Sequence, residues 1–77
     1  MTKNELEKIL IEKKIPTNTY SLDGKFYPDR FELYFNNEEW MVYYCDERGV
    51  KHDLKTFKGE EDACQYFYEY LTGVMFN

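Results

Sequence analysis

The sequence predicts a small α+β fold with two layers. We expect a three-stranded antiparallel meander, with an N-terminal and a C-terminal helix packed on one face of it. Apolar residues recur at helical spacing near both ends of the chain, and they alternate with polar residues in its middle. Turn-forming residues separate the alternating runs. A chain of 77 residues has room for one domain, which would span 1–77.

The first expected helix begins at a capping box, in which Thr2 is the N-cap and Glu5 stands three residues later. Apolar residues follow at helical spacing. Pro16 disfavours helical geometry in the residue before it, so we expect the helix to end shortly before that point. Residues 16–30 then form turns and extended chain, with room for a short extra strand. The expected anchors of this segment are Tyr20, Leu22, Phe26 and Tyr27.

Three alternating runs predict the strands, at 31–35, 40–45 and 50–57. Polar residues at 36–39 and 46–49 supply the two turns between them. One face of this sheet is strongly apolar and would pack beneath the helices. The residues expected on that face are Phe31, Leu33, Phe35, Trp40, Val42, Tyr44, Val50 and Leu54, with Phe31, Leu33, Trp40, Val42 and Leu54 expected to be buried.

The last expected helix begins at Glu60, Glu61 and Asp62, because acidic residues complement the positive end of a helix dipole. Gly73 is the expected C-terminal cap. The apolar stripe of this helix consists of Ala63, Cys64, Phe67, Tyr70 and Leu71.

If both helices cover one face of the sheet, the other face is open to a partner. It would show Glu32, Tyr34, Met41, Tyr43, Cys45, Lys51, Asp53 and Lys55. Exposed aromatic residues and methionine with a charged rim are typical of contact surfaces, so Tyr34, Met41 and Tyr43 are the candidate anchors. The same face would also allow a homodimer. The alternative is that the tyrosines are ordinary strand residues, half covered by their neighbours.

The charge distribution favours a basic protein partner. Residues 1–37 hold six acids and six bases, whereas residues 38–77 hold nine acids and four bases and carry the whole net charge of −5. Such a surface repels phosphate backbones and argues against nucleic acid. The candidate acidic contacts are Glu38, Glu39, Asp46, Glu47, Glu60, Glu61 and Asp62. The alternative is that these acids are solvated turn and helix-start residues.

The sequence offers little for catalysis. His52 is the only histidine, and its place inside an expected strand shows no nucleophile beside it. Cys45 and Cys64 form no metal-binding pair, and they fit free thiols in a reducing compartment. We therefore expect no enzyme activity, no cofactor and no metal.

The chain shows neither a membrane span nor a secretory signal. No stretch approaches the roughly 20 apolar residues that cross a bilayer. The N-terminal residues mix charged and apolar types, unlike the continuous apolar segment of a signal peptide. We therefore expect a cytoplasmic protein.

The region from Phe31 to Leu71 resembles small immunity proteins that bacteria encode beside polymorphic or contact-dependent toxins. The resemblance rests on an aromatic hairpin at 40–44, the turn at 46–49, and the residues Leu54, Lys55, Phe57, Glu60, Glu61, Ala63 and Cys64. It implies a cytoplasmic protein that neutralises a cognate toxin domain by direct binding. Many such toxins are nucleases with basic clefts, which an acidic blocker would suit. The alternative function is a small homo-oligomeric or adaptor module with no toxin partner.

Overall fold

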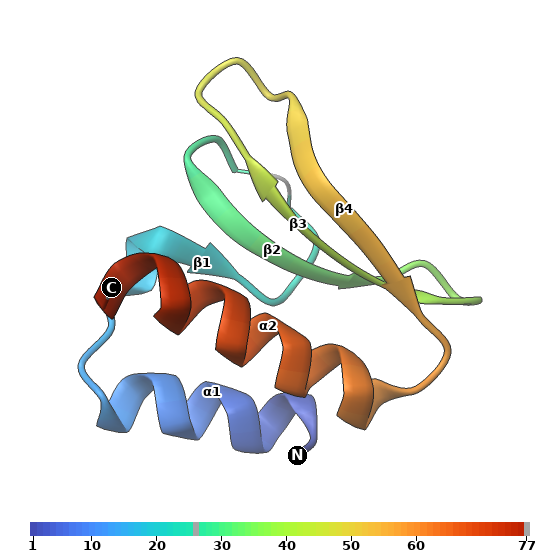
Figure 1. Ribbon diagram of the computed structural model, residues 1–77, viewed down its shortest axis with the longest axis horizontal. Coiled ribbons are helices and arrows are strands. Elements are labelled where there is room, and N and C mark those ends of the chain that lie inside the picture. Colours follow the sequence, from blue (N-terminus) through green and yellow to red (C-terminus); the bar gives the residue numbers. More distant parts are fainter. Residues whose placement is uncertain (26, 77) are drawn as a thin grey trace.

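The computed structural model describes residues 1–25 and 27–76, without the side chains of residues 75 and 76. Both helices lie on one side of a sheet (Figure 1). One helix precedes the strands in the chain and the other follows them, as expected of this α+β fold. The elements are α1 (Lys3–Glu12), a 3-10 turn η1 (Thr17–Thr19), β1 (Tyr20–Ser21), β2 (Arg30–Phe35), β3 (Trp40–Cys45), β4 (Lys51–Phe57) and α2 (Glu60–Phe76).

The sheet is mixed rather than wholly antiparallel. Its described strands lie in the order β1-β2-β3-β4. The meander of β2, β3 and β4 is antiparallel, as predicted. The prediction of only three strands is wrong, because β1 adds a two-residue parallel pairing in which Tyr20 lies opposite Phe31 and Ser21 opposite Glu32.

Local sequence signals set the start of α1 but not the end of α2. The Thr2 hydroxyl accepts a hydrogen bond from the Glu5 amide at 3.3 Å, and the Glu5 carboxylate accepts one from the Thr2 amide at 2.8 Å. Lys14 takes a left-handed φ of 60° just after the helix. The predicted cap at Gly73 is wrong, because α2 keeps helical geometry through that residue.

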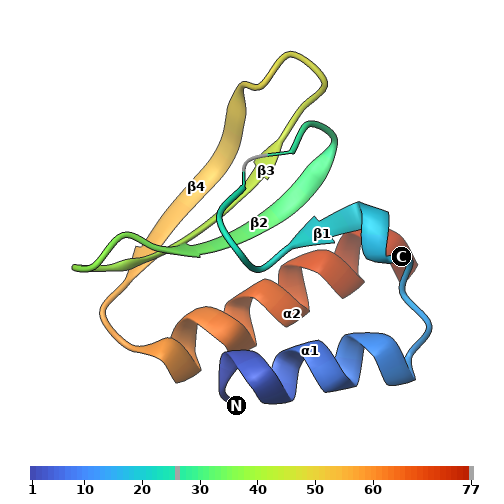
Figure 2. The same ribbon diagram turned by 180° about the vertical axis from the view of Figure 1, so that it is seen from behind.

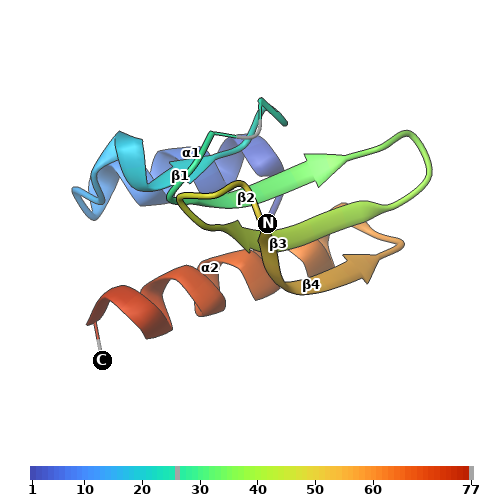
Figure 3. The same ribbon diagram turned by 90° about the horizontal axis from the view of Figure 1, so that it is seen from above.

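The core lies between the helices and one face of the sheet. Seen from above, α1 lies on the β1 side and α2 on the β4 side of that face (Figure 3). The predicted burial of Phe31, Leu33 and Val42 is confirmed, whereas Trp40 is only partly buried. The helices contribute Leu6, Leu10, Ala63, Cys64, Phe67 and Leu71 to this core.

A bulge in β4 reverses the predicted facing of the residues that follow it in the strand. Val42 pairs with Lys55 while Tyr44 pairs with His52, so β4 carries one extra residue between these pairs. Leu54 is therefore 48% exposed, and its predicted burial is wrong. Lys55 instead reaches toward α2, with its ammonium 5.4 Å from the ring centroid of Tyr66.

Val50 was also expected on the apolar face, and that prediction is wrong too. It precedes β4 and is 51% exposed. Asp53, expected on the opposite face, accepts a hydrogen bond from the hydroxyl of Tyr70 in α2. Both differences arise because the strand begins at Lys51 and then bulges, so simple alternation fails across it.

The face turned away from the helices is partly covered, so the prediction that it is open throughout is wrong. A parallel pairing of β1 and β2 requires the chain to return before it enters β2. Residues 22–25 and 27–29 lie on this return, alongside β2 (Figure 2). A Cβ atom on Gly24 would overlap the Tyr34 ring, coming within 2.6 Å of Cε1. Glu32 and Tyr43 are fully buried on this side, and Cys45 is 4% exposed.

The predicted anchors of the 16–30 segment differ in burial. Tyr20 is buried and Leu22 is partly buried against the core. Tyr27 is 39% exposed, with the Arg30 guanidinium 4.2 Å from its ring centroid. Phe26 lies outside the described residues. Among the described anchors, those that are buried or partly buried therefore lie in the first half of the segment.

Candidate functional site

The three candidate aromatic anchors do not form an accessible set. Tyr43 has no exposed surface, and the Lys51 ammonium lies 5.4 Å from its ring centroid. Tyr34 and Met41 pair across β2 and β3 and are partly buried. Tyr43 therefore offers a partner no surface in this conformation, and its predicted role as an anchor is corrected. The homodimer through this face stays a prediction.

The seven candidate acidic residues lie at two opposite ends of the sheet. Trp40 pairs with Phe57, which brings the β2–β3 turn beside the start of α2 (Figure 1). The Lys58 ammonium lies 3.9 Å from a carboxylate oxygen of Glu39 across this junction. We call this region the acidic end, which contains Glu38, Glu39, Glu60, Glu61 and Asp62. Asp46 and Glu47 lie at the other end, in the β3–β4 turn.

Asp46 is committed to its own turn. Its Oδ1 accepts hydrogen bonds from the amides of Arg48 and Val50, both at 2.9 Å. Its Oδ2 lies 2.7 Å from Nε2 of His52. The His52 contact and these amides lower the pKa of Asp46. The carboxylate therefore builds the turn, and its side chain is only 26% exposed.

Two residues of the acidic end also support the fold. Glu60 Oε2 accepts a hydrogen bond from the Lys3 amide at 2.9 Å, and a Glu61 oxygen lies 3.9 Å from the N-terminal amine. These contacts join the first turns of α1 and α2, where negative charge complements both helix dipoles. Glu38 and Asp62 are exposed and have no such structural role in the described contacts.

An aromatic pair lies at the acidic end. The ring centroids of Phe35 and Trp40 are 4.9 Å apart, and Phe35 is 43% exposed. Phe35 is the last residue of β2 and Trp40 the first of β3. The alternating pattern predicts both residues on the apolar face, and the pairing of Phe35 with Trp40 confirms it. Their position at the end of the hairpin could have indicated exposure, because the helices bury less of the sheet at its ends.

At the opposite end lies an apolar hollow of about 260 Å³, lined by Phe31, Tyr44, Tyr70 and Val74. We call it the aromatic hollow. The Phe31 ring centroid is 5.0 Å from that of Tyr44 and 5.1 Å from that of Tyr70, the second pair being edge to face. Val74 is 59% exposed at its margin. The helical pattern predicts Tyr70 in the apolar stripe of α2, but it does not predict a concavity there.

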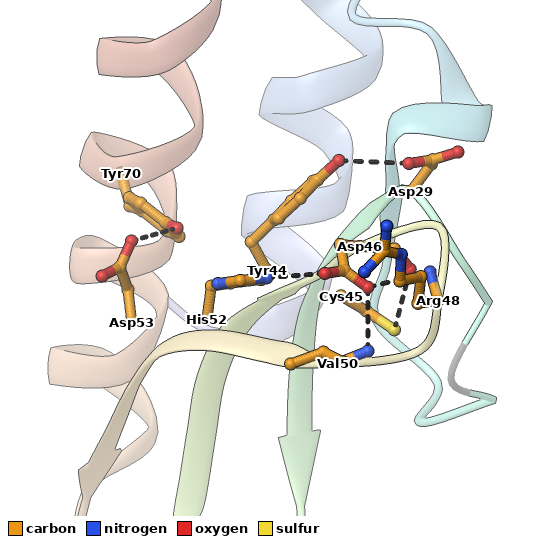
Figure 4. A network of polar contacts seen from close by, with 9 residues as sticks. All are labelled: Asp29, Tyr44, Cys45, Asp46, Arg48, Val50, His52, Asp53 and Tyr70. Atoms are coloured by element: carbon orange, nitrogen blue, oxygen red, sulfur yellow. Dashed lines mark hydrogen bonds and ion pairs between the residues drawn. The ribbon is translucent and has the colours of Figure 1, made fainter.

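Two carboxylates contact the hydroxyls of the tyrosines that line the aromatic hollow (Figure 4). The Tyr44 hydroxyl donates to Asp29 at 3.3 Å, and the Tyr70 hydroxyl donates to Asp53 at 3.1 Å. Burial, and then the bond to Asp53, raise the pKa of Tyr70 to about 12. Burial and the nearby Asp29 also raise the pKa of Tyr44. Both hydroxyls therefore stay protonated and keep donating at neutral pH.

Unusual backbone geometry places the two carboxylates. Asp29 has a φ of 58° and Asp53 a φ of 55°. Aspartate is among the few residues that adopt this left-handed region readily. Asp53 occupies the bulge of β4, which redirects its side chain toward α2. A bulge leaves no mark in an alternating pattern, so this arrangement could not be predicted from the sequence.

Glu32 is a fully buried carboxyl group on the covered face of the sheet. Among the described residues, neither of its oxygens has a partner with full hydrogen-bond geometry. Burial raises its pKa from 4.5 to about 7, and the nearby Ser21 hydroxyl and Tyr27 amide offset part of that effect. The group lies outside both surfaces described above.

The thiols and the histidine do not come together. Cys45 and Cys64 are both free and buried, the first on the covered face and the second in the helical core. Within the described part of the chain, no three acidic, histidine or cysteine side chains gather as a metal site would require. In residues 1–25 and 27–76, no helix is both long and apolar enough to cross a membrane.

Comparisons of the chain with models of protein families, with curated proteins and with solved structures found no match.

Proposed function

We propose that this chain is a cytoplasmic immunity protein that neutralises a cognate bacterial toxin domain by binding it directly. The observation that carries the proposal is the acidic end, where the Phe35–Trp40 ring pair lies beside the turn that holds Glu38 and Glu39. Aromatic residues surrounded by polar groups commonly dominate binding energy at protein interfaces. The resemblance of residues 31–71 to immunity proteins supports the same reading.

The charge of this surface suits a basic toxin domain. Glu38 is exposed and Glu39 partly buried, in a turn that projects from the sheet. Exposed charges at an interface rim mainly raise the association rate, by steering an oppositely charged partner. The acidic end would compete with the phosphate backbone of a nucleic acid for a basic cleft on the toxin. Binding alone would then block the toxin, without any chemistry on this chain.

The decisive experiment uses the C-terminal domain encoded by the neighbouring gene. That domain would be expressed in a host that it kills, with and without this chain. We expect the chain to restore growth and to co-purify with the domain. If it neither restores growth nor co-purifies, the proposed function is wrong.

A charge-reversal pair tests the choice of surface. We expect the double substitution Glu38→Lys, Glu39→Lys to slow association by about tenfold and to weaken its dependence on salt, because steering is electrostatic. The matched control is Glu7→Lys, Glu12→Lys on exposed positions of α1, which changes net charge equally. Stopped-flow binding at several salt concentrations measures both. Equal slowing by the two variants would assign steering to net charge rather than to the acidic end.

A further inference from the structure

We infer that the aromatic hollow receives the side chain of a lysine or arginine from the basic partner. Only the source of that side chain, a basic toxin domain, rests on the proposed function. The hollow itself is defined by Phe31, Tyr44, Tyr70 and Val74, and it lies at the end of the sheet opposite the Phe35–Trp40 pair. Occupied in this way, it would give the complex a second point of attachment.

The arrangement of the rings suits a cation. A positive group is attracted to the face of an aromatic ring when it lies within about 6 Å of the centroid. The centroids of Tyr44 and Tyr70 are 5.0 and 5.1 Å from that of Phe31. One group seated in the hollow can therefore approach more than one ring. The aliphatic stem of lysine or arginine would cover Val74, whose side chain is 59% exposed.

The rim of the hollow supplies negative charge. Asp29 and Asp53 accept hydrogen bonds from the hydroxyls of Tyr44 and Tyr70, so each carboxylate lies at the outer edge of a lining ring. The basic groups beside them are already engaged. The Arg30 guanidinium lies over the Tyr27 ring, and His52 contacts Asp46. A cation therefore complements this rim, whereas a phosphate group or an acidic peptide would be repelled.

The charge on the rim also separates a cation from an apolar occupant. An isoleucine or leucine could enter this apolar space, but it would bring no charge to complement Asp29 and Asp53. A cationic group with an aliphatic stem satisfies both the rings and the carboxylates.

Short peptides test the inference without any toxin. The probes are acetyl-Gly-Lys-Gly-amide and acetyl-Gly-Arg-Gly-amide, with the uncharged norleucine peptide as the matched control. NMR titration follows the Val74 methyl groups and the rings of Tyr44 and Tyr70. We expect saturable shifts with at least one cationic peptide and binding about tenfold weaker for norleucine. Equal binding of norleucine, or no saturable shift with either cation, overturns the inference.

A second variant pair separates local charge from net charge. Asn also adopts the left-handed backbone and still accepts from tyrosine, so Asp29→Asn, Asp53→Asn should keep the fold while removing two charges. The control Glu7→Gln, Glu12→Gln removes two charges from exposed positions of α1. We expect only the first pair to weaken binding of the cationic peptide, by about tenfold. Equal weakening by both pairs overturns the inference.

The two proposals fail separately. If the chain restores growth against the toxin but binds no cationic peptide, the aromatic hollow has no such role and the proposed function stands. If the hollow binds the peptides but the chain does not restore growth, the cation site stands and the toxin proposal fails.

Discussion

Glu32 shows how a single residue can oppose the fold that contains it. Its carboxyl group has no exposed surface, and burial raises its pKa to about 7 from an ordinary 4.5. Between those two values the folded chain holds a proton that the unfolded chain has lost. Protein stability therefore falls as pH rises through this window, because deprotonation is easier in the unfolded state.

Glu32→Gln should remove that dependence. We expect the variant to be roughly 1–2 kcal/mol more stable than the parent near pH 8, because a buried charge with poor hydrogen bonding is replaced by a neutral amide. Near pH 4.5 the two proteins should differ much less. Urea unfolding across this range measures both curves, with the exposed Glu47→Gln as the control. Parallel curves for parent and Glu32→Gln would show that Glu32 titrates normally.

Tyr43 gives a second prediction at this scale. Among the described residues, Tyr43 is the largest of the fully buried side chains. Its truncation therefore leaves a cavity on the face of the sheet that is turned away from the helices. We expect Tyr43→Ala to lower the free energy of unfolding by roughly 3–5 kcal/mol, enough to unfold a domain of this size. Circular dichroism during heating measures the change. A folded variant with an unchanged melting temperature would contradict the burial of this ring.

Among the elements, the connection between β1 and β2 is the one that packs on the face of the sheet turned away from the helices. It returns alongside β2, and its Gly24 packs against the ring of Tyr34. Gly24 also has a φ of 74°, which disfavours any side chain. Gly49 has a similar φ of 81° in the β3–β4 turn, but no atom beyond its two chain neighbours lies within 4 Å of the position a Cβ would take.

These two glycines form a matched pair. We expect Gly49→Ala to destabilise the protein by roughly 1 kcal/mol through backbone strain alone. Gly24→Ala should cost about 1–3 kcal/mol more, because the added methyl group must displace the Tyr34 ring. Thermal unfolding of both variants gives the difference. Equal losses would mean that the connection does not press on the sheet.

Elements with a sustained local pattern could be predicted from the sequence. The capping box at Thr2 marks the start of α1, and the alternation around Leu33 and Val42 marks β2 and β3 with the correct inner face. The parallel strand β1 has only two residues, too few to show a period. The facing of β4 depends on a backbone bulge, which apolar alternation cannot report.

The acidic residues of the candidate site could be predicted from the sequence, but their arrangement in space and the aromatic hollow could not. The acids at 38–39 and 60–62 could be found because turns and helix starts are local features, although their proximity depends on the pairing of Trp40 with Phe57. The aromatic hollow could not be found. It joins Phe31 to Tyr70 across the chain, and its rim depends on the left-handed φ of Asp53. Such long-range placement has no signature in a single sequence.

For the whole molecule, the Phe35–Trp40 pair connects fold and proposed partner binding. Phe35 is 43% exposed at the end of β2, so the fold gains little from it. We expect Phe35→Ala to change the melting temperature only slightly but to speed dissociation from the toxin domain by about tenfold or more, as for an aromatic anchor. Surface plasmon resonance measures the rate. Unchanged dissociation would place the anchor elsewhere.

The two outer strands of the sheet also bear on how the chain behaves at high concentration. An unpaired strand edge can template the growth of cross-chain sheets, which is a common route to aggregation. Here β1 at one edge is only two residues long. At the other edge, β4 is bulged at Asp53 and carries Lys51 and Lys55. Each edge is thus a poor template, so we expect the chain to reach high concentrations without joining its own copies into fibres.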